Sequence, residues 1–189
     1  MPGRTPHDAI RNYIDPLQQA VSCLGCAKIQ LSQTPKRYGE FGAWILNGGN
    51  GMVLRGFGKF YATQRFELVP TTADLHDAPE KEPFRVSTRE YIYRLEIANE
   101  SHVIEWHWHP VGNSDERRPH IHPAINRDAH LPGPRVVLED VIEGCIALGA
   151  TPACEDWKER LAASGGVHKL YRTWVHEPGD LKKPAVKED

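Results

Sequence analysis

Tryptophan and histidine alternate along residues 102–109 of this chain, which read HVIEWHWH. Successive side chains of a β-strand point to opposite faces of the sheet. Glu105, His107 and His109 would therefore share one face. Trp106 and Trp108 would share the other. Because burial of tryptophan is strongly favourable, we expect the tryptophan face to lie against the core and the histidine face to be polar.

A second histidine-bearing segment, PHIHP at residues 119–123, follows the ten-residue loop PVGNSDERRP, with which it shares Pro119. In a short strand here, His120 and His122 would share one face and Ile121 would point to the other. We expect this strand to pair with the first in an antiparallel meander.

The pairing register decides whether the two sets of histidines meet. If His109 lies opposite His120, then His107 lies opposite His122, and directly opposed Cβ atoms are about 5 Å apart. A slip by one residue would place tryptophans opposite histidines, so the buried face favours this register. It gathers four imidazoles and the carboxylate of Glu105 on one patch.

Four histidines on one sheet face offer the ligands that zinc, iron, nickel and copper ions accept. Two histidines on one strand, completed by a third from its neighbour, can converge on one ion through their ring nitrogens. We predict a divalent transition metal, most readily zinc, held by His107, His109, His120 and His122. Glu105 is predicted as a further ligand or as a base, and these five residues form the predicted catalytic centre.

Three interpretations of this patch stay open. In the first, the metal ion activates water or polarises a substrate. In the second, two histidines act as general acid and base without metal, while an anion such as the phosphate of RNA is bound by Arg94, Arg117 or Arg118. In the third, the histidines are only a polar outer face of the sheet, hydrated and paired with nearby carboxylates.

Outlying histidines and cysteines carry weaker signals. His130, in a loop, could complete the site, and His168 and His176 would share a face if their segment is helical. Cys23 and Cys26 have the spacing of a zinc-binding pair. The other two cysteines lie nine positions apart, so no second closely spaced pair completes a zinc ribbon.

The rest of the sequence predicts one α+β domain over residues 1–175 and a disordered, charged tail over 176–189. A hydroxyl N-cap at Thr5, followed by proline and an acidic residue, predicts an N-terminal helix. Strand-like runs separated by glycines predict an antiparallel sheet of five or six strands across residues 40–125. Two helices after residue 134 are expected to pack on the tryptophan face.

Charge and composition narrow the functional classes. The chain has 25 acidic against 23 basic residues and a net charge of −2. Proteins that bind nucleic acids or membrane surfaces by charge are usually basic, so only a local basic site is compatible. There is no long apolar run and no apolar signal-peptide core. We therefore expect a cytoplasmic protein with reduced cysteines and no membrane association.

The motifs along residues 84–160 resemble those of an uncharacterised family of bacterial proteins. In that family a strand ending in HxHP is followed by PHxH and then by a helix start of the form HLPxxRVxLEDV. This chain carries HWHP at 107–110, PHIH at 119–122 and HLPGPRVVLEDV at 130–141. The family has no settled activity, so this resemblance implies no particular reaction.

More distantly, the aromatic strand, the histidine strand and the PHIHP element resemble the core of TumE-type toxins of bacterial toxin–antitoxin pairs. This resemblance implies a toxin-like activity directed at RNA and centred on His120 and His122, with RNA or a cognate antitoxin-like protein as partner. The favoured function is a histidine-centred, metal-dependent hydrolase, such as a toxin-like nuclease. The alternative is a non-enzymatic partner-binding or regulatory protein with a polar histidine-rich sheet face.

Overall fold

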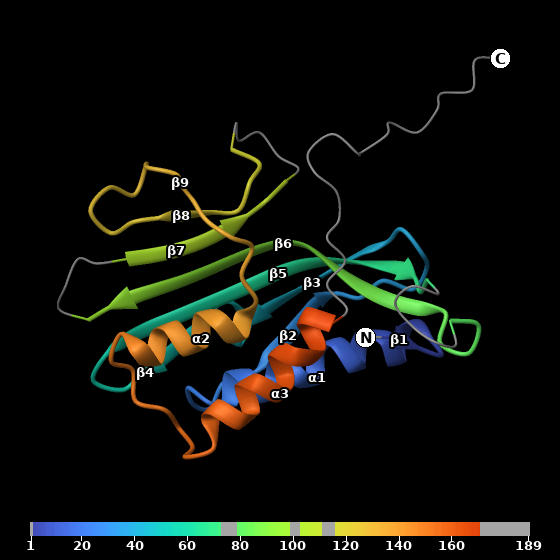
Figure 1. Cartoon of the computed structure of the whole chain (residues 1–189), viewed down its shortest axis with the longest axis horizontal. Helices are drawn as coiled ribbons and strands as arrows, with labels where there is room; N and C mark the ends of the chain where they lie inside the picture. The colour runs from blue at the N-terminus through green and yellow to red at the C-terminus, as the bar shows by residue number, and fades with distance from the viewer. Residues whose placement is uncertain (1, 73–78, 99–102, 111–115, 171–189) are drawn as a thin grey trace.

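The computed structural model describes residues 2–72, 79–98, 103–110 and 116–170. Within these ranges the chain forms an open antiparallel sheet with three helices on one face, which confirms the predicted α+β class (Figure 1). The predicted tail over residues 176–189 lies outside the described residues.

The described sheet has nine strands, more than the five or six predicted. They are β1 (Pro2–Gly3), β2 (Ile29–Gln33), β3 (Phe41–Leu46), β4 (Met52–Leu54), β5 (Gly58–Pro70), β6 (Phe84–Ile97), β7 (Val103–Trp108), β8 (His120–His122) and β9 (Leu131–Pro132). The three extra strands, β1, β2 and β9, lie outside residues 40–125. Two of them have only two residues, and β2 buries only Ile29, so their alternation signal is weak.

Neighbouring strands follow the order β2-β3-β5-β6-β7-β8-β9, with β1 paired to β6 and β4 to β5. This order places β7 and β8, which carry the histidine motifs, side by side near one end of the sheet (Figure 1). The prediction that the two histidine strands are antiparallel neighbours is confirmed.

The helices are α1 (Pro6–Ser22), α2 (Leu138–Ala147) and α3 (Trp157–Leu170), with a short 3-10 turn, η1, at Asn47–Gly49. α1 begins as predicted, because the hydroxyl of Thr5 accepts a hydrogen bond from the amide of Asp8 at 3.1 Å. α1 and α2 contact β6, and α3 packs on both helices. None of the described helices is long and apolar enough to cross a membrane.

The core lies between the helices and the sheet and consists largely of aromatic side chains at alternate strand positions. Trp44 of β3, Phe60 and Phe66 of β5, and Tyr91 and Tyr93 of β6 are all buried. The positions between them point to the opposite face, where the sheet is only partly buried. That second face is the one that carries the histidines.

Polar groups within this core are paired with one another. The side-chain oxygen of Gln64 accepts hydrogen bonds from the hydroxyl of Tyr13 and from Nε1 of Trp44. Its amide nitrogen donates to the hydroxyl of Tyr93. Because a buried polar group without a partner costs about 1–3 kcal/mol, this network stabilises the contact between α1 and the three central strands.

Trp108 anchors the histidine strand β7 to the core. It is 8% exposed, and its ring lies 6.0 Å from the ring of Tyr91. The guanidinium of Arg135 stacks 3.8 Å from the centroid of Trp108 and donates a hydrogen bond to the carbonyl oxygen of Thr88 at 2.8 Å. Trp106, half-buried, also packs against the core. The tryptophan face is therefore the core face, as predicted.

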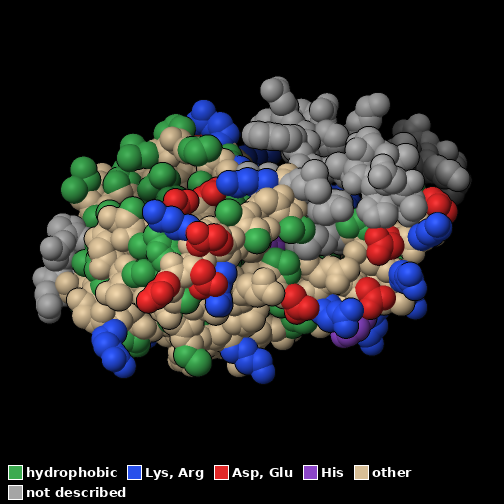
Figure 2. Space-filling model, turned by 60° about the horizontal axis from the view of Figure 1, so that its bottom comes forward, with side chains coloured by type: hydrophobic (Ala, Val, Ile, Leu, Met, Phe, Trp, Pro, Cys, Tyr) green, Lys and Arg blue, Asp and Glu red, His purple; other side chains and the backbone are tan. Residues whose placement is uncertain are grey.

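Charged side chains of both signs are interspersed on the face shown in Figure 2. Among the described residues on that face they form no continuous basic stripe. This distribution agrees with the net charge of −2 and does not favour binding of a polyanion along this face by charge alone.

We expect Trp108→Ala to lower the free energy of unfolding by about 3–5 kcal/mol, because it removes a large buried side chain. Urea denaturation followed by circular dichroism measures this change. Val53 of β4 provides the control, because it is 73% exposed. Its truncation to Ala should change stability by no more than about 0.5 kcal/mol. Equal effects of the two substitutions would show that Trp108 is not an anchor.

Candidate metal centre

The register between β7 and β8 differs from the predicted one. His107 lies opposite His120 and Glu105 lies opposite His122, so the prediction that paired His109 with His120 is wrong by two residues. β7 ends at Trp108, which leaves His109 just beyond the paired region. A shift by two residues keeps every side chain on its predicted face, and the alternation alone therefore does not distinguish the two registers.

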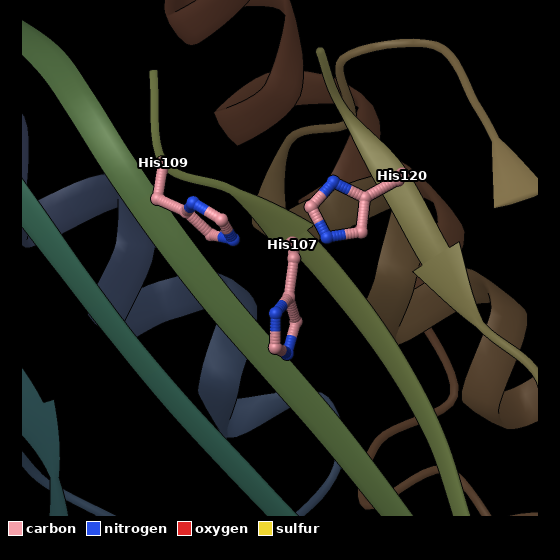
Figure 3. Close-up of side chains that lie close together, drawn as sticks. All are labelled: His107, His109 and His120. Atoms are coloured by element: carbon pink, nitrogen blue, oxygen red, sulfur yellow. The ribbon is translucent and has the colours of Figure 1, made fainter. Parts of the chain in front are cut away.

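Five imidazoles nevertheless meet on this face, and we call His107, His109, His120, His122 and His130 the histidine cluster. Ring centroids lie 4.5 Å apart for His107 and His122, 5.1 Å for His109 and His120, and 4.8 Å for His120 and His130. In Figure 3 the rings of His109 and His120 point toward one another, with His107 projecting beside them. The structure thus brings together all four predicted metal ligands and His130.

Two sets of three histidines in this cluster have the spacing of metal ligands. One set is His107, His109 and His120, and the other is His120, His122 and His130. In each set, one ring nitrogen per residue lies within 4.8 Å of the others. Nitrogens bound to one tetrahedral zinc ion are about 3.4 Å apart, so a shift of roughly 1.5 Å or less would bring a set to ligand geometry.

Backbone carbonyl groups orient two of these rings. Nδ1 of His120 donates a hydrogen bond to the carbonyl oxygen of Arg118 at 2.8 Å, and Nδ1 of His122 donates to that of Arg127 at 2.7 Å. Since a carbonyl oxygen only accepts, Nδ1 carries the proton in each neutral ring. The lone pair is then on Nε2, and this arrangement is usual for metal-binding histidines.

His120 has an unsatisfied nitrogen in a buried position. The residue is 2% exposed, and its Nε2 atom has no hydrogen-bond partner among the described residues. A buried lone pair without a partner is unfavourable in a folded protein. A metal ion or a hydrogen-bond donor at this position would satisfy the atom.

Glu105 lies next to the cluster and faces His107. Its Oε2 atom is 3.0 Å from Nε2 of His107, an ion-pair distance, although the angle is not that of a hydrogen bond. Its Oε1 atom is 3.2 Å from Nε of Arg94 and 3.5 Å from Nη2 of Arg127. Glu105 belongs to neither histidine set, so this geometry favours contact with a ligand-bearing ring over direct coordination.

The arginines predicted to bind substrate lie near the cluster in different settings. Arg94 pairs with Glu96 as well as with Glu105. Arg118 donates to both carboxylate oxygens of Glu116, at 3.0 and 2.8 Å, and these hydrogen bonds lower the pKa of Glu116 to about 2. Arg117, the residue before Arg118, is exposed. A substrate-binding role for these three arginines stays a prediction.

Arg127 was missed by the sequence reasoning, which named His130 only as a loop candidate. Arg127 lies within, and His130 just after, a turn in which the amide of Asn126 donates to the carbonyl of Pro123 and the amide of Asp128 to the side chain of Asn126. This turn places the carbonyl of Arg127 under His122 and the ring of His130 4.6 Å from that of His122. Asn126, a residue type that favours turns, was the sequence signal that could have indicated the positions of Arg127 and His130.

His168 lies on the other side of the sheet and does not join the cluster. In α3, its Nδ1 is 2.6 Å from Oε1 of Glu139 in α2, and its Nε2 is 3.3 Å from the carbonyl oxygen of Tyr13 in α1. It therefore links the three helices, beside a cavity of about 50 Å³ that Tyr91 also lines. His176 lies outside the described residues.

The cysteines also lie apart from the histidine cluster. Cys23 is buried at the end of α1, Cys26 is exposed, and all four cysteines are free thiols. Among the described residues, neither Cys23 nor Cys26 belongs to a group of potential metal ligands.

Burial keeps the central imidazoles neutral. It lowers the pKa of His107 from 6.5 to about 4, with His122 acting in the same direction and Glu105 in the opposite one. Burial also lowers the pKa of His120. Neutral imidazole is the form that binds metals.

Comparison with known proteins assigns no family to this fold and site. A search with protein-family models finds no match to the chain, and searches among curated proteins and solved structures find none either. The geometry of the cluster is therefore the basis for a proposed function.

The low pKa of His107 predicts how stability varies with pH. Between about 6.5 and 4 the unfolded chain binds this proton and the folded chain does not, so stability falls as the pH is lowered through that window. We expect the stability of His107→Gln to fall less than that of the unsubstituted chain as the pH is lowered through this window. Urea titrations at several pH values, with a chelator present, measure the difference. Parallel plots of the free energy of unfolding against pH for the two proteins would contradict a lowered pKa of His107.

Proposed function

We propose that this protein binds a divalent transition-metal ion, most readily zinc, on the histidine cluster and uses it to hydrolyse a phosphodiester. The observation that carries the proposal is the buried Nε2 atom of His120, which has no hydrogen-bond partner among the described residues. A metal ion would satisfy this lone pair, and the neighbouring imidazoles would supply the remaining ligands.

Two competing interpretations of the cluster fit the observations less well. Histidines of a hydrated polar face would be open to water, whereas His120 is 2% exposed and the side chain of His107 is 15% exposed. A general acid–base pair works best with pKa values near the working pH. Burial lowers the pKa of His107 to about 4, well below neutrality.

The residues of the cluster suit metal-assisted hydrolysis. Three imidazoles would hold the ion and leave a position for water, and a zinc ion would lower the pKa of that water to about 7. We assign to Glu105, which contacts His107, the role of accepting the proton that this water would release. The side chain of Arg127 is exposed at the rim, 3.5 Å from Glu105, and offers a guanidinium to an anionic substrate.

The choice of a phosphodiester substrate also draws on the resemblance to TumE-type toxins. That resemblance supports RNA as the substrate and a cognate antitoxin-like protein as a partner. The four free cysteines favour a reducing compartment, and we place the activity in the cytoplasm on that ground.

Metal binding is tested by elemental analysis of the chain purified without a histidine tag. We expect about one equivalent of metal. We expect His120→Asn to bind it more than about 100-fold more weakly, since loss of a ligand should exceed the 10–100-fold effect of losing a supporting partner. The asparagine amide can keep the hydrogen bond to the carbonyl of Arg118 but lacks Nε2, so the fold is preserved.

His7→Ala is the matched control for metal binding. His7 is an exposed histidine of α1, and its removal should leave the metal content unchanged. Retention of the metal by His120→Asn at full affinity would contradict the proposed site.

Hydrolysis is tested with bis(p-nitrophenyl) phosphate and a single-stranded RNA oligonucleotide as substrates. We expect activity to disappear after chelation and to return with added zinc. Glu105→Gln should lower kcat by about 10²–10⁴-fold if the carboxylate acts as the base. Metal binding without hydrolysis of either substrate would contradict the enzymatic part of the proposal and leave a metal-binding regulatory protein.

A further inference from the structure

His120 is common to both sets of potential metal ligands. Its Nδ1 atom is held by the carbonyl of Arg118, so the neutral ring has a single lone pair, on Nε2. One lone pair forms a bond to one metal ion at a time. The two sets comprise five histidines because they share His120. They therefore cannot each bind an ion through three histidines at the same time.

The two sets differ in their access to solvent. We call His107, His109 and His120 the inner triad, because each of its members is at least partly buried. The outer triad, His120, His122 and His130, includes one exposed histidine, His130. The sets are contiguous, since the rings of His107 and His122 have centroids only 4.5 Å apart.

We infer that the cluster holds one ion at either of two positions, and that the ion is loaded at the outer triad and then passes to the inner triad. This inference rests on the proposed metal binding. During the transfer the ion stays bound to His120. Its bonds to His122 and His130 break while bonds to His107 and His109 form. Two imidazole ligands replace two others and the ion keeps its charge, so the step needs no electron donor.

The charge distribution favours the inner position as the resting site. The carboxylate of Glu105 is 3.0 Å from Nε2 of His107, and a carboxylate in contact with a metal-bound imidazole strengthens the binding of a cation. On the outer side, the ring of His122 is held by a neutral carbonyl group, that of Arg127. The outer triad is thus the accessible position and the inner triad the more strongly binding one.

The inference is tested by titrating the chelator-treated full chain with Co²⁺, whose visible absorption reports the ligands around the ion. We expect saturation at one equivalent. Truncating His109 or His130 to Ala should leave one equivalent bound, with a different spectrum for each variant because each retains only one triad. His120→Asn breaks both triads and should lose binding by more than about 100-fold. His7→Ala is again the control.

The loading route is tested by following Co²⁺ uptake in a stopped-flow instrument. We expect His130→Ala to lose rapid uptake while keeping the spectrum of the inner triad, and His109→Ala to keep rapid uptake. Uptake by His130→Ala at the unsubstituted rate would overturn the loading route.

The stoichiometry separates this inference from the proposed function. Two equivalents bound to the unsubstituted chain would overturn the shared-ligand inference and leave metal-dependent hydrolysis standing. Binding of neither Co²⁺ nor Zn²⁺ to the unsubstituted chain would overturn the proposed function itself.

Discussion

Burial of Trp108 between Tyr91 and Arg135 determines which way β7 faces. Because side chains alternate along a strand, a tryptophan held against the core forces its neighbour His107 onto the opposite face. β8 then pairs with β7, and its own alternation brings His120 to the same side. The cluster is thus a consequence of apolar packing on the far side of the sheet, where burial of a large aromatic side chain is worth several kcal/mol.

The sequence pattern predicted correctly which face of the sheet each histidine lies on. It did not predict the register between β7 and β8, and therefore not which histidines lie closest together. Alternation placed His107, His109, His120 and His122 on one face, and the helix start at Thr5 was also predictable from local hydrogen bonding. The two-residue error in register arose because such a shift moves no side chain between faces. The orientation of His120 and His122 depends on backbone carbonyl groups, which every residue possesses and no sequence motif reveals. The position of His130 depends on the local turn at Asn126.

The carboxylate beside the histidine cluster is balanced by nearby arginines. Glu105 lies between Arg94 and Arg127 and faces His107. The central rings are neutral because burial lowers the pKa of His107 and His120. A site of neutral ligands with one adjacent carboxylate can accept a divalent cation without first displacing a bound positive charge. The interspersed surface charges and the net charge of −2 are compatible with a localised function of this kind.

The short strand β9 has a consequence for how other molecules reach the cluster. Pro132 of β9 pairs with His120 of β8, and a proline has no N–H group to offer a further strand. β9 is also only two residues long. This margin of the sheet is therefore a poor template for β-strand addition. A molecule that contacts the cluster would approach across the open face of the sheet.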